Sequence, residues 1–119
     1  MIQNFSHLIA WQKSHELVLN IYKILKKLPN EEKFALADQM RRSSVSITSN
    51  IAEGFSRNTK KEKVQFYTIS KGSLSELYNQ LITARDLEYI TDIDFKKLDL
   101  MIEESSKLIS AIIKSAKDK

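Results

Sequence analysis

Apolar side chains recur along the chain at steps of three and four residues, the spacing that puts them on one face of an α-helix. Four such stretches, separated by short polar segments, predict helices over about 6–28, 31–53, 60–84 and 92–116. The face-forming positions of the third and fourth stretches keep a seven-residue period: Tyr67, Ser70, Leu74, Leu77, Leu81 and Ala84, then Phe95, Leu98, Ile102, Ser105, Ile109, Ile112 and Ala116.

The short connections predict how these helices are arranged. A link of a few residues forces consecutive helices to run antiparallel, so the expected fold is all-α, an antiparallel up-down-up-down four-helix bundle that forms a single domain over residues 1–119. Two glycines and one proline are too few for the turns of a sheet protein. Helices of about 20 residues would give a rod about 30 Å long.

Several residues have the chemistry of helix ends. Ser6 is placed to cap the first helix, and Pro29 to stop it. Gly54 fits a left-handed cap after the second helix. Thr59 and Glu62 have the spacing of a capping box, in which each side chain bonds a backbone N–H of the other's turn. The third helix is therefore expected to begin at residue 60.

Composition narrows the possible functions. Without cysteine the chain has no disulfide or thiolate metal site, which suits a reducing, cytoplasmic location. No apolar run approaches the roughly 20 residues that span a membrane. His7 and His15 lack a glutamate three positions earlier, the spacing by which bundles hold paired metal ions. With no phosphate loop or nucleophile motif either, we expect no catalytic site, metal or cofactor.

The net charge of +4 comes from one segment, residues 55–71, whose only acid is Glu62; the rest of the chain is neutral. We interpret its basic side chains as a candidate nucleic-acid site: Arg57, Lys60, Lys61, Lys63 and Lys71. The aromatic rings of Phe55, Phe66 and Tyr67 lie between them and could stack on bases. The alternative is a solvated hairpin end whose aromatic side chains belong to the core.

The second helix has an unusual polar stripe. At 100° per residue its polar side chains fall within about 120° of one another: Gln39, Arg42, Ser43, Ser46, Ser49, Asn50 and Glu53. Exposed helix faces are usually rich in Lys and Glu, whereas short Ser and Asn side chains allow helices to approach closely. The stripe is therefore either a solvated face or, as we favour, a half-buried network inside the bundle or between subunits.

A matching polar face on the third helix supplies Ser73, Glu76 and Gln80. If the second and third helices pair as a hairpin in which the numbers of two facing residues add up to about 115, Arg42 lies opposite Ser73. Arg42 then forms a buried ion pair with Glu76. The predicted polar network is Arg42, Ser46, Asn50, Glu53, Ser73, Glu76 and Gln80. Gly72, next to Ser73 and one turn from Glu76, either permits close approach of the two helix backbones or simply weakens the third helix.

Three segments carry a family resemblance: QMRRSSVSITSNIAEG at 39–54, GSLSEL at 72–77 and LIAWQK at 8–13. The chain resembles the 23S rRNA intervening-sequence proteins from about residue 5 to 113, and is also similar to the accessory protein of diversity-generating retroelements. The resemblance implies a bundle that assembles into a ring, commonly a homopentamer, and binds RNA. Many relatives have proline where this chain has Thr48, so a kink there is not implied.

Two functions remain open at this stage. The first is a nucleic-acid-binding accessory protein, with structured RNA as the partner. The second is a ring-shaped scaffold that recruits a protein partner and does not contact nucleic acid. Trp11, on the first helix, is either a core side chain or a contact between subunits of such an oligomer.

Overall fold

The computed structural model describes residues 4–118. Within them lie four α-helices and two short 3-10 turns: η1 (Phe5–His7), α1 (Ile9–Leu25), η2 (Asn30–Glu32), α2 (Leu36–Ser56), α3 (Lys60–Asp86) and α4 (Asp92–Asp118). No strand occurs in this part of the chain, so the predicted all-α class is confirmed.

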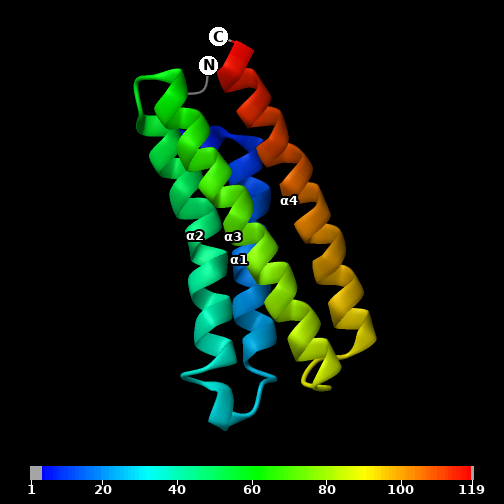
Figure 1. The fold of residues 1–119 in the computed structure, drawn as a ribbon. Helices are drawn as coiled ribbons and strands as arrows, with labels where there is room; N and C mark the ends of the chain where they lie inside the picture. The colour runs from blue at the N-terminus through cyan, green and yellow to red at the C-terminus, as the bar shows by residue number, and fades with distance from the viewer. Residues whose placement is uncertain (1–3, 119) are drawn as a thin grey trace.

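The four helices alternate in direction and form a bundle (Figure 1). Each packs against its two neighbours in the order α1, α2, α3, α4 and back to α1, and among the described residues the backbones of diagonally opposite helices lie farther apart. The bundle measures 45 × 25 × 21 Å. It is longer than expected because α3 and α4 have 27 residues each, which is about 40 Å of helix.

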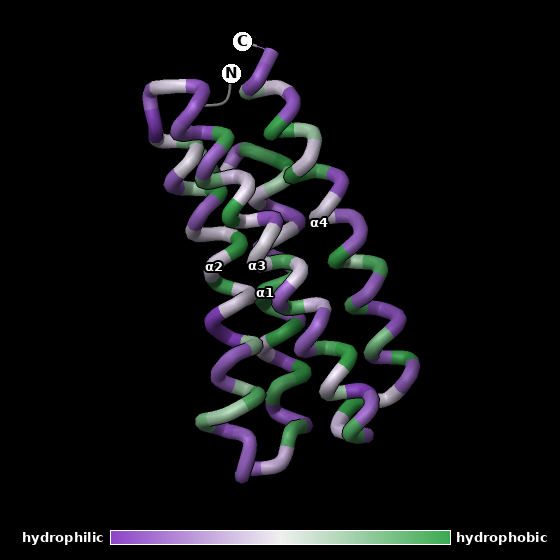
Figure 2. The backbone as a smooth tube through the Cα atoms, in the orientation of Figure 1, coloured by the Kyte–Doolittle hydropathy of each residue, from purple (hydrophilic) through white to green (hydrophobic). Residues whose placement is uncertain are grey.

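The interior is built from the apolar face of every helix, and Figure 2 shows how apolar positions recur along each one. The largest fully buried apolar side chains are Leu17, Ile21, Met40, Ile47, Ile51, Leu77, Leu81 and Ile109. Each helix also contributes one serine with no exposed surface: Ser14, Ser44, Ser70 and Ser105. Small side chains at these positions let the helices approach closely.

The beginnings of α1 and α2 differ from the prediction. Ser6 does not cap α1; Asn4 instead caps the preceding turn η1 by accepting the Ser6 backbone N–H at 2.8 Å. The second helix starts at Leu36, later than expected, because the backbone breaks at Ala35, with φ −119° and ψ −106°. The Glu32 carboxylate accepts the Leu36 N–H at 3.3 Å and replaces the missing helical bond.

The end of α2 gives Gly54 a different role from the predicted one. The helix continues to Ser56, and Gly54 lies inside it without a positive φ. A Cβ on Gly54 would come within 2.6 Å of Cε1 of Tyr67, so the absent side chain makes room for α3. The left-handed cap was therefore a wrong prediction, and the glycine serves helix contact.

The turn into α3 follows the prediction closely. The Thr59 hydroxyl accepts the backbone N–H of Glu62 at 3.2 Å and caps the helix that begins at Lys60. The Glu62 carboxylate bonds the Thr59 hydroxyl at 3.0 Å rather than the backbone N–H that a capping box uses. Upstream, α2 passes through Thr48 without interruption, since a threonine keeps the backbone N–H that proline lacks.

No helix of residues 4–118 is both long enough and apolar enough to cross a membrane.

Candidate functional site

The contact between α2 and α3 brings together part of the predicted polar network. The hydroxyls of Ser46 and Ser73 lie 2.8 Å apart across the two helices. The Asn50 amide donates to the Ser46 carbonyl at 2.8 Å and to its hydroxyl at 3.1 Å. Deeper in the core, the Ser70 hydroxyl donates to the Ile47 carbonyl at 2.7 Å. These short side chains hold α2 and α3 together inside one chain.

The expected ion pair between Arg42 and Glu76 does not form. Arg42 extends into solvent with 81% of its side chain exposed and bonds Asp38 on its own helix at 2.9 Å, and Glu76 is exposed too. The register is not the cause, because Ser46 faces Ser73, so facing positions sum to 119 and Arg42 lies level with Leu77, next to Glu76. Both side chains point to solvent instead, and Asp38 on the same helix is the acid that Arg42 reaches.

The pair between Arg42 and Asp38 is a surface interaction. The hydrogen bond from Arg42 lowers the pKa of the Asp38 carboxyl. Of the other predicted network members, Glu53 is exposed and pairs with Arg57 at 3.3 Å. Gln80 is half-buried, and its Oε1 has no hydrogen-bond partner among the described residues. Neither of them joins Ser46, Asn50 and Ser73 through a hydrogen bond that the structure shows.

The basic residues of segment 55–71 divide into two groups. Lys60 and Lys61 are exposed in the first turn of α3. Lys63 folds back instead, and its ammonium donates to the carbonyls of Gly54 and Phe55 at 3.3 and 2.7 Å, near the end of α2. The Gly54 carbonyl also accepts the Arg57 backbone N–H, so the Lys63 ammonium adds a second bond there and supplies a donor to the Phe55 carbonyl at the helix end.

Two further basic side chains contact their own chain. Arg57 lies 3.3 Å from the Glu53 carboxylate and 3.9 Å from that of Glu62. Lys71 lies further along α3, and its ammonium donates to the Ser110 hydroxyl of α4 at 2.6 Å. Once both acids are counted against the four basic residues at the hairpin end, the local charge is +2, and Lys60 and Lys61 are its exposed part.

The aromatic rings of this segment face their own cations. The Arg57 guanidinium lies 4.8 Å from the centre of the Phe66 ring, and the Lys63 ammonium 5.4 Å from that of Phe55. Tyr67 is buried against Gly54, and this burial raises the pKa of its hydroxyl. For these three rings the structure therefore supports the interpretation that they pack within their own chain, and not the interpretation that they are open for stacking on bases.

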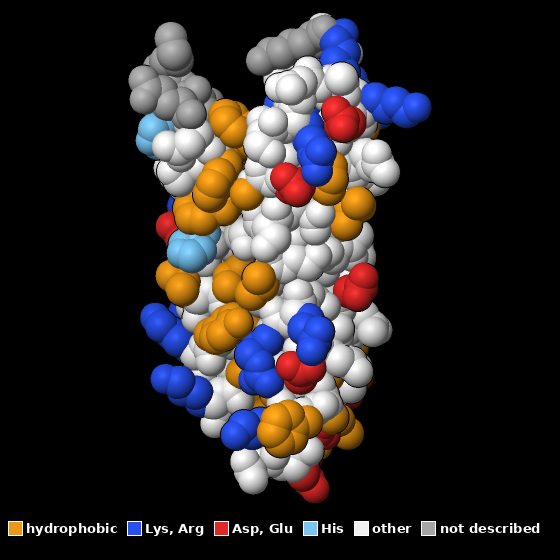
Figure 3. Space-filling model, turned by 90° about the vertical axis from the view of Figure 1, so that its left-hand side faces the viewer, with side chains coloured by type: hydrophobic (Ala, Val, Ile, Leu, Met, Phe, Trp, Pro, Cys, Tyr) orange, Lys and Arg blue, Asp and Glu red, His pale blue; other side chains and the backbone are white. Residues whose placement is uncertain are grey.

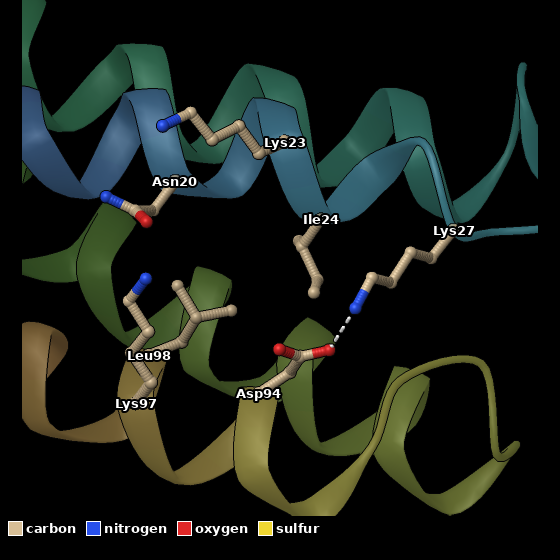
Figure 4. Close-up of a pocket in the computed structure, with 7 residues that line it drawn as sticks. All are labelled: Asn20, Lys23, Ile24, Lys27, Asp94, Lys97 and Leu98. Atoms are coloured by element: carbon tan, nitrogen blue, oxygen red, sulfur yellow. Dashed lines mark hydrogen bonds and ion pairs between the residues drawn. The ribbon is translucent and has the colours of Figure 1, made fainter.

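Folding also assembles a basic pocket that the sequence pattern did not indicate. A cavity of about 140 Å³ lies between α1 and α4, lined among others by Asn20, Lys23, Lys27 and Lys97 (Figure 4). Its one carboxylate, Asp94, accepts a hydrogen bond from Lys27 at 2.6 Å, and this bond lowers the Asp94 pKa. The lysines come from positions far apart in sequence, so only the pairing of α1 with α4 reveals them.

The face over α1 and α2 carries an exposed apolar band (Figure 3). Leu19, Tyr22 and Val45 keep 49, 43 and 39% of their surface exposed. Trp11, on α1 with Leu19 and Tyr22, is half-buried, and its ring stacks on that of His15 with 4.6 Å between centres. Contiguous apolar surface of this kind is typical of sites where another protein surface packs.

Taken together, these features define a small helical bundle whose serines tighten one helix contact and whose exposed lysines gather toward its ends. The chain belongs to the 23S rRNA-intervening sequence protein family, whose model matches residues 6–111. It is also similar to a crystal structure of a protein of unknown function from the S23 ribosomal protein family of Bacteroides thetaiotaomicron, with 29% identity and a TM-score of 0.82 over 89% of this chain and 99% of that one. No curated protein matches it.

Within the described residues no group of three or more His, Cys, Asp or Glu side chains lies close enough to hold a metal ion.

Proposed function

We propose that this protein is a non-enzymatic accessory protein of the cytoplasm that binds structured RNA as a homo-oligomer, with a pentamer as the favoured state. The observation that carries the proposal is the pair of exposed lysines, Lys60 and Lys61, at the start of α3 in a member of the 23S rRNA-intervening sequence protein family. Backbone N–H groups of the same helical turn add to the attraction for phosphate.

The proposed RNA contact is electrostatic. Lysines bind phosphate oxygens, which are the same in every nucleotide, so we expect little sequence preference. A pair of lysines binds weakly by itself. In a ring of five chains the pair is repeated five times on one rigid body, which raises the effective concentration of each next contact.

The apolar band over α1 and α2 supports assembly. Leu19, Tyr22 and Val45 leave apolar surface in water that a second copy of the chain would cover. Trp11, the half-buried ring beside them, has the size and rigidity that dominate contacts between subunits. Light scattering coupled to size exclusion tests this: we expect a mass about five times 13.8 kDa, and a mass near 13.8 kDa would contradict it.

The RNA contact is tested by fluorescence anisotropy with a labelled RNA hairpin at low and rising salt. We expect Lys60→Ala/Lys61→Ala to lower affinity and to flatten the salt dependence by about one unit of slope for each phosphate that is no longer bound. Lys96→Ala/Lys114→Ala is the matched control, because it removes two exposed lysines of α4 and leaves the same net charge. If both double variants bind as the wild type does, the lysines at the start of α3 are not the site.

A second function, a scaffold that recruits a protein partner, is favoured by one observation. Arg57, Lys63 and Lys71 all contact their own chain, which leaves the apolar band as the larger exposed feature. A wild-type protein that forms the oligomer but binds no RNA at low salt would support the scaffold and exclude the RNA function.

A further inference from the structure

The turn between α1 and α2 encloses a second group of cations. A cavity of about 200 Å³ there is lined by Lys26, Lys33 and Arg41, together with Asn30 and apolar residues. No carboxylate lines it. Three cationic residues around one small cavity, of which only Arg41 has an acid nearby, favour an anion at this place.

One of these cations, Arg41, is held in place by the turn itself. The Arg41 guanidinium donates to the Lys33 carbonyl at 2.8 Å, so α2 is tied to the segment that precedes it. It also lies 3.6 Å from Asp38, one turn earlier on the same helix. Because the arginine and the Lys33 backbone hold each other, the cavity is present before any ligand arrives.

An aromatic ring stands beside this cavity. Phe34 is the next residue after Lys33 and keeps 86% of its surface in water. The Lys33 ammonium lies 5.5 Å from the centre of the Phe34 ring, so one side chain links the ring to the cavity. The ring therefore contributes little to the core. Figure 3 shows that Lys and Arg side chains gather on the lower half of the face over α1 and α2.

We propose that the α1–α2 turn binds single-stranded RNA, with a backbone phosphate in the cavity of Lys26, Lys33 and Arg41 and an unpaired base stacked on Phe34. This inference takes its ligand class from the proposed RNA function and adds a second site to it. The site selects an unpaired strand, since in a duplex each base face is already covered by its neighbours. Cations that hold the phosphate and a ring that holds the base are the two parts of sequence-tolerant single-strand recognition.

The stacking part is tested with two labelled probes, an oligoadenylate and an abasic phosphodiester of the same length. Phe34→Ala should weaken oligoadenylate binding by about fivefold or more and leave the abasic probe unchanged, because only the first probe has bases. Ile93→Ala is the matched control: it truncates an apolar side chain that is 81% exposed on α4. A Phe34→Ala variant that binds oligoadenylate as the wild type does, or that loses both probes equally, overturns the stacking.

The phosphate part is tested with Lys26→Ala/Lys33→Ala, which should weaken both probes and reduce the salt slope. Lys96→Ala/Lys114→Ala again controls for net charge. Equal binding by these two double variants overturns the phosphate site. If that happens while the wild type binds RNA through the start of α3, the proposed function stands and only this inference fails. If the wild type binds neither probe nor the RNA hairpin, both fail.

Discussion

Replacing Gly54 with alanine tests how closely α2 and α3 approach. The new Cβ would lie 2.6 and 2.8 Å from two ring carbons of Tyr67 and 3.1 Å from Cβ of Phe66. The ring cannot easily move away, because Tyr67 is only 4% exposed. Overpacking of this kind costs about 1–3 kcal/mol. Alanine regains about 1 kcal/mol of helix propensity, so we expect Gly54→Ala to destabilise the fold by about 1 kcal/mol.

Gly72→Ala is the matched control, since Gly72 also lies inside a helix but a Cβ added there would meet nothing within 4 Å. Only the propensity gain applies there, and the variant should be more stable than the wild type by about 1 kcal/mol. Urea denaturation followed by circular dichroism measures both free energies of unfolding. The difference between the two variants isolates the steric cost at Gly54.

The reasoning fails if Gly54→Ala is as stabilising as Gly72→Ala. That result would mean that α2 and α3 can separate without cost, and that the serine network does not fix their distance. A destabilised Gly72→Ala would instead show that its open side is covered in solution, which is the outcome expected if a second copy of the chain packs on that part of α3.

Four further substitutions test three other features by the same denaturation assay. Ser70→Ala should cost about 1 kcal/mol by removing a buried hydrogen bond to α2, whereas Ser14→Ala should be neutral or stabilising because its buried hydroxyl has no partner among the described residues. Glu88→Gly should stabilise by about 1 kcal/mol, since Glu88 adopts a φ of 63° that favours glycine; an unchanged midpoint would count against strain at this turn. The hydrogen bond from Lys27 lowers the pKa of the Asp94 carboxyl. This bond therefore stabilises the fold above the ordinary carboxyl pKa of about 4, and the stabilisation is lost as the pH falls through the lowered pKa. Lys27→Met should reduce the loss of stability between neutral and acidic pH.

The helices were predictable because their signal is local. A core-facing side chain every three or four residues specifies a helix wherever it packs, and the Thr59 cap marks the start of α3 in the sequence itself. Helix ends were less predictable. A glycine such as Gly54 is typical of a helix terminus, yet its role depends on its close approach to Tyr67, which the sequence alone does not indicate.

The polar network also differs from the prediction. Because α2 continues to Ser56, the hairpin turns about two residues later and the facing positions shift by a helical turn. Ser46 still reaches Ser73 of α3, and Asn50 binds Ser46 within α2. Arg42 lies level with Glu76 in this register, yet both side chains point to solvent and Arg42 binds Asp38 instead. The pattern along one helix thus predicts which side chains share a face, but not which residue of the next helix each of them contacts.

Some of the candidate lysines could be found from a local sequence pattern, and others only from the folded chain. Lys60 and Lys61 could be found because they lie together in sequence at a recognisable helix start. The cluster at the α1–α2 turn could not, because Lys26, Lys33 and Arg41 line one cavity only after the chain folds back at this turn. An aromatic residue outside the apolar period, in a turn, was its one visible signal.

The two proposed RNA contacts lie at opposite ends of α2, which has 21 residues and so separates them by about 30 Å. One strand that spans both ends would be weakened by either Lys26→Ala/Lys33→Ala or Lys60→Ala/Lys61→Ala, with the number of strands bound per protein unchanged. Two strands bound separately would behave differently: each double variant would remove one strand and leave the affinity of the other as it was. Titration with oligoadenylates of increasing length distinguishes these cases, since affinity rises steeply only when a strand becomes long enough to reach both ends.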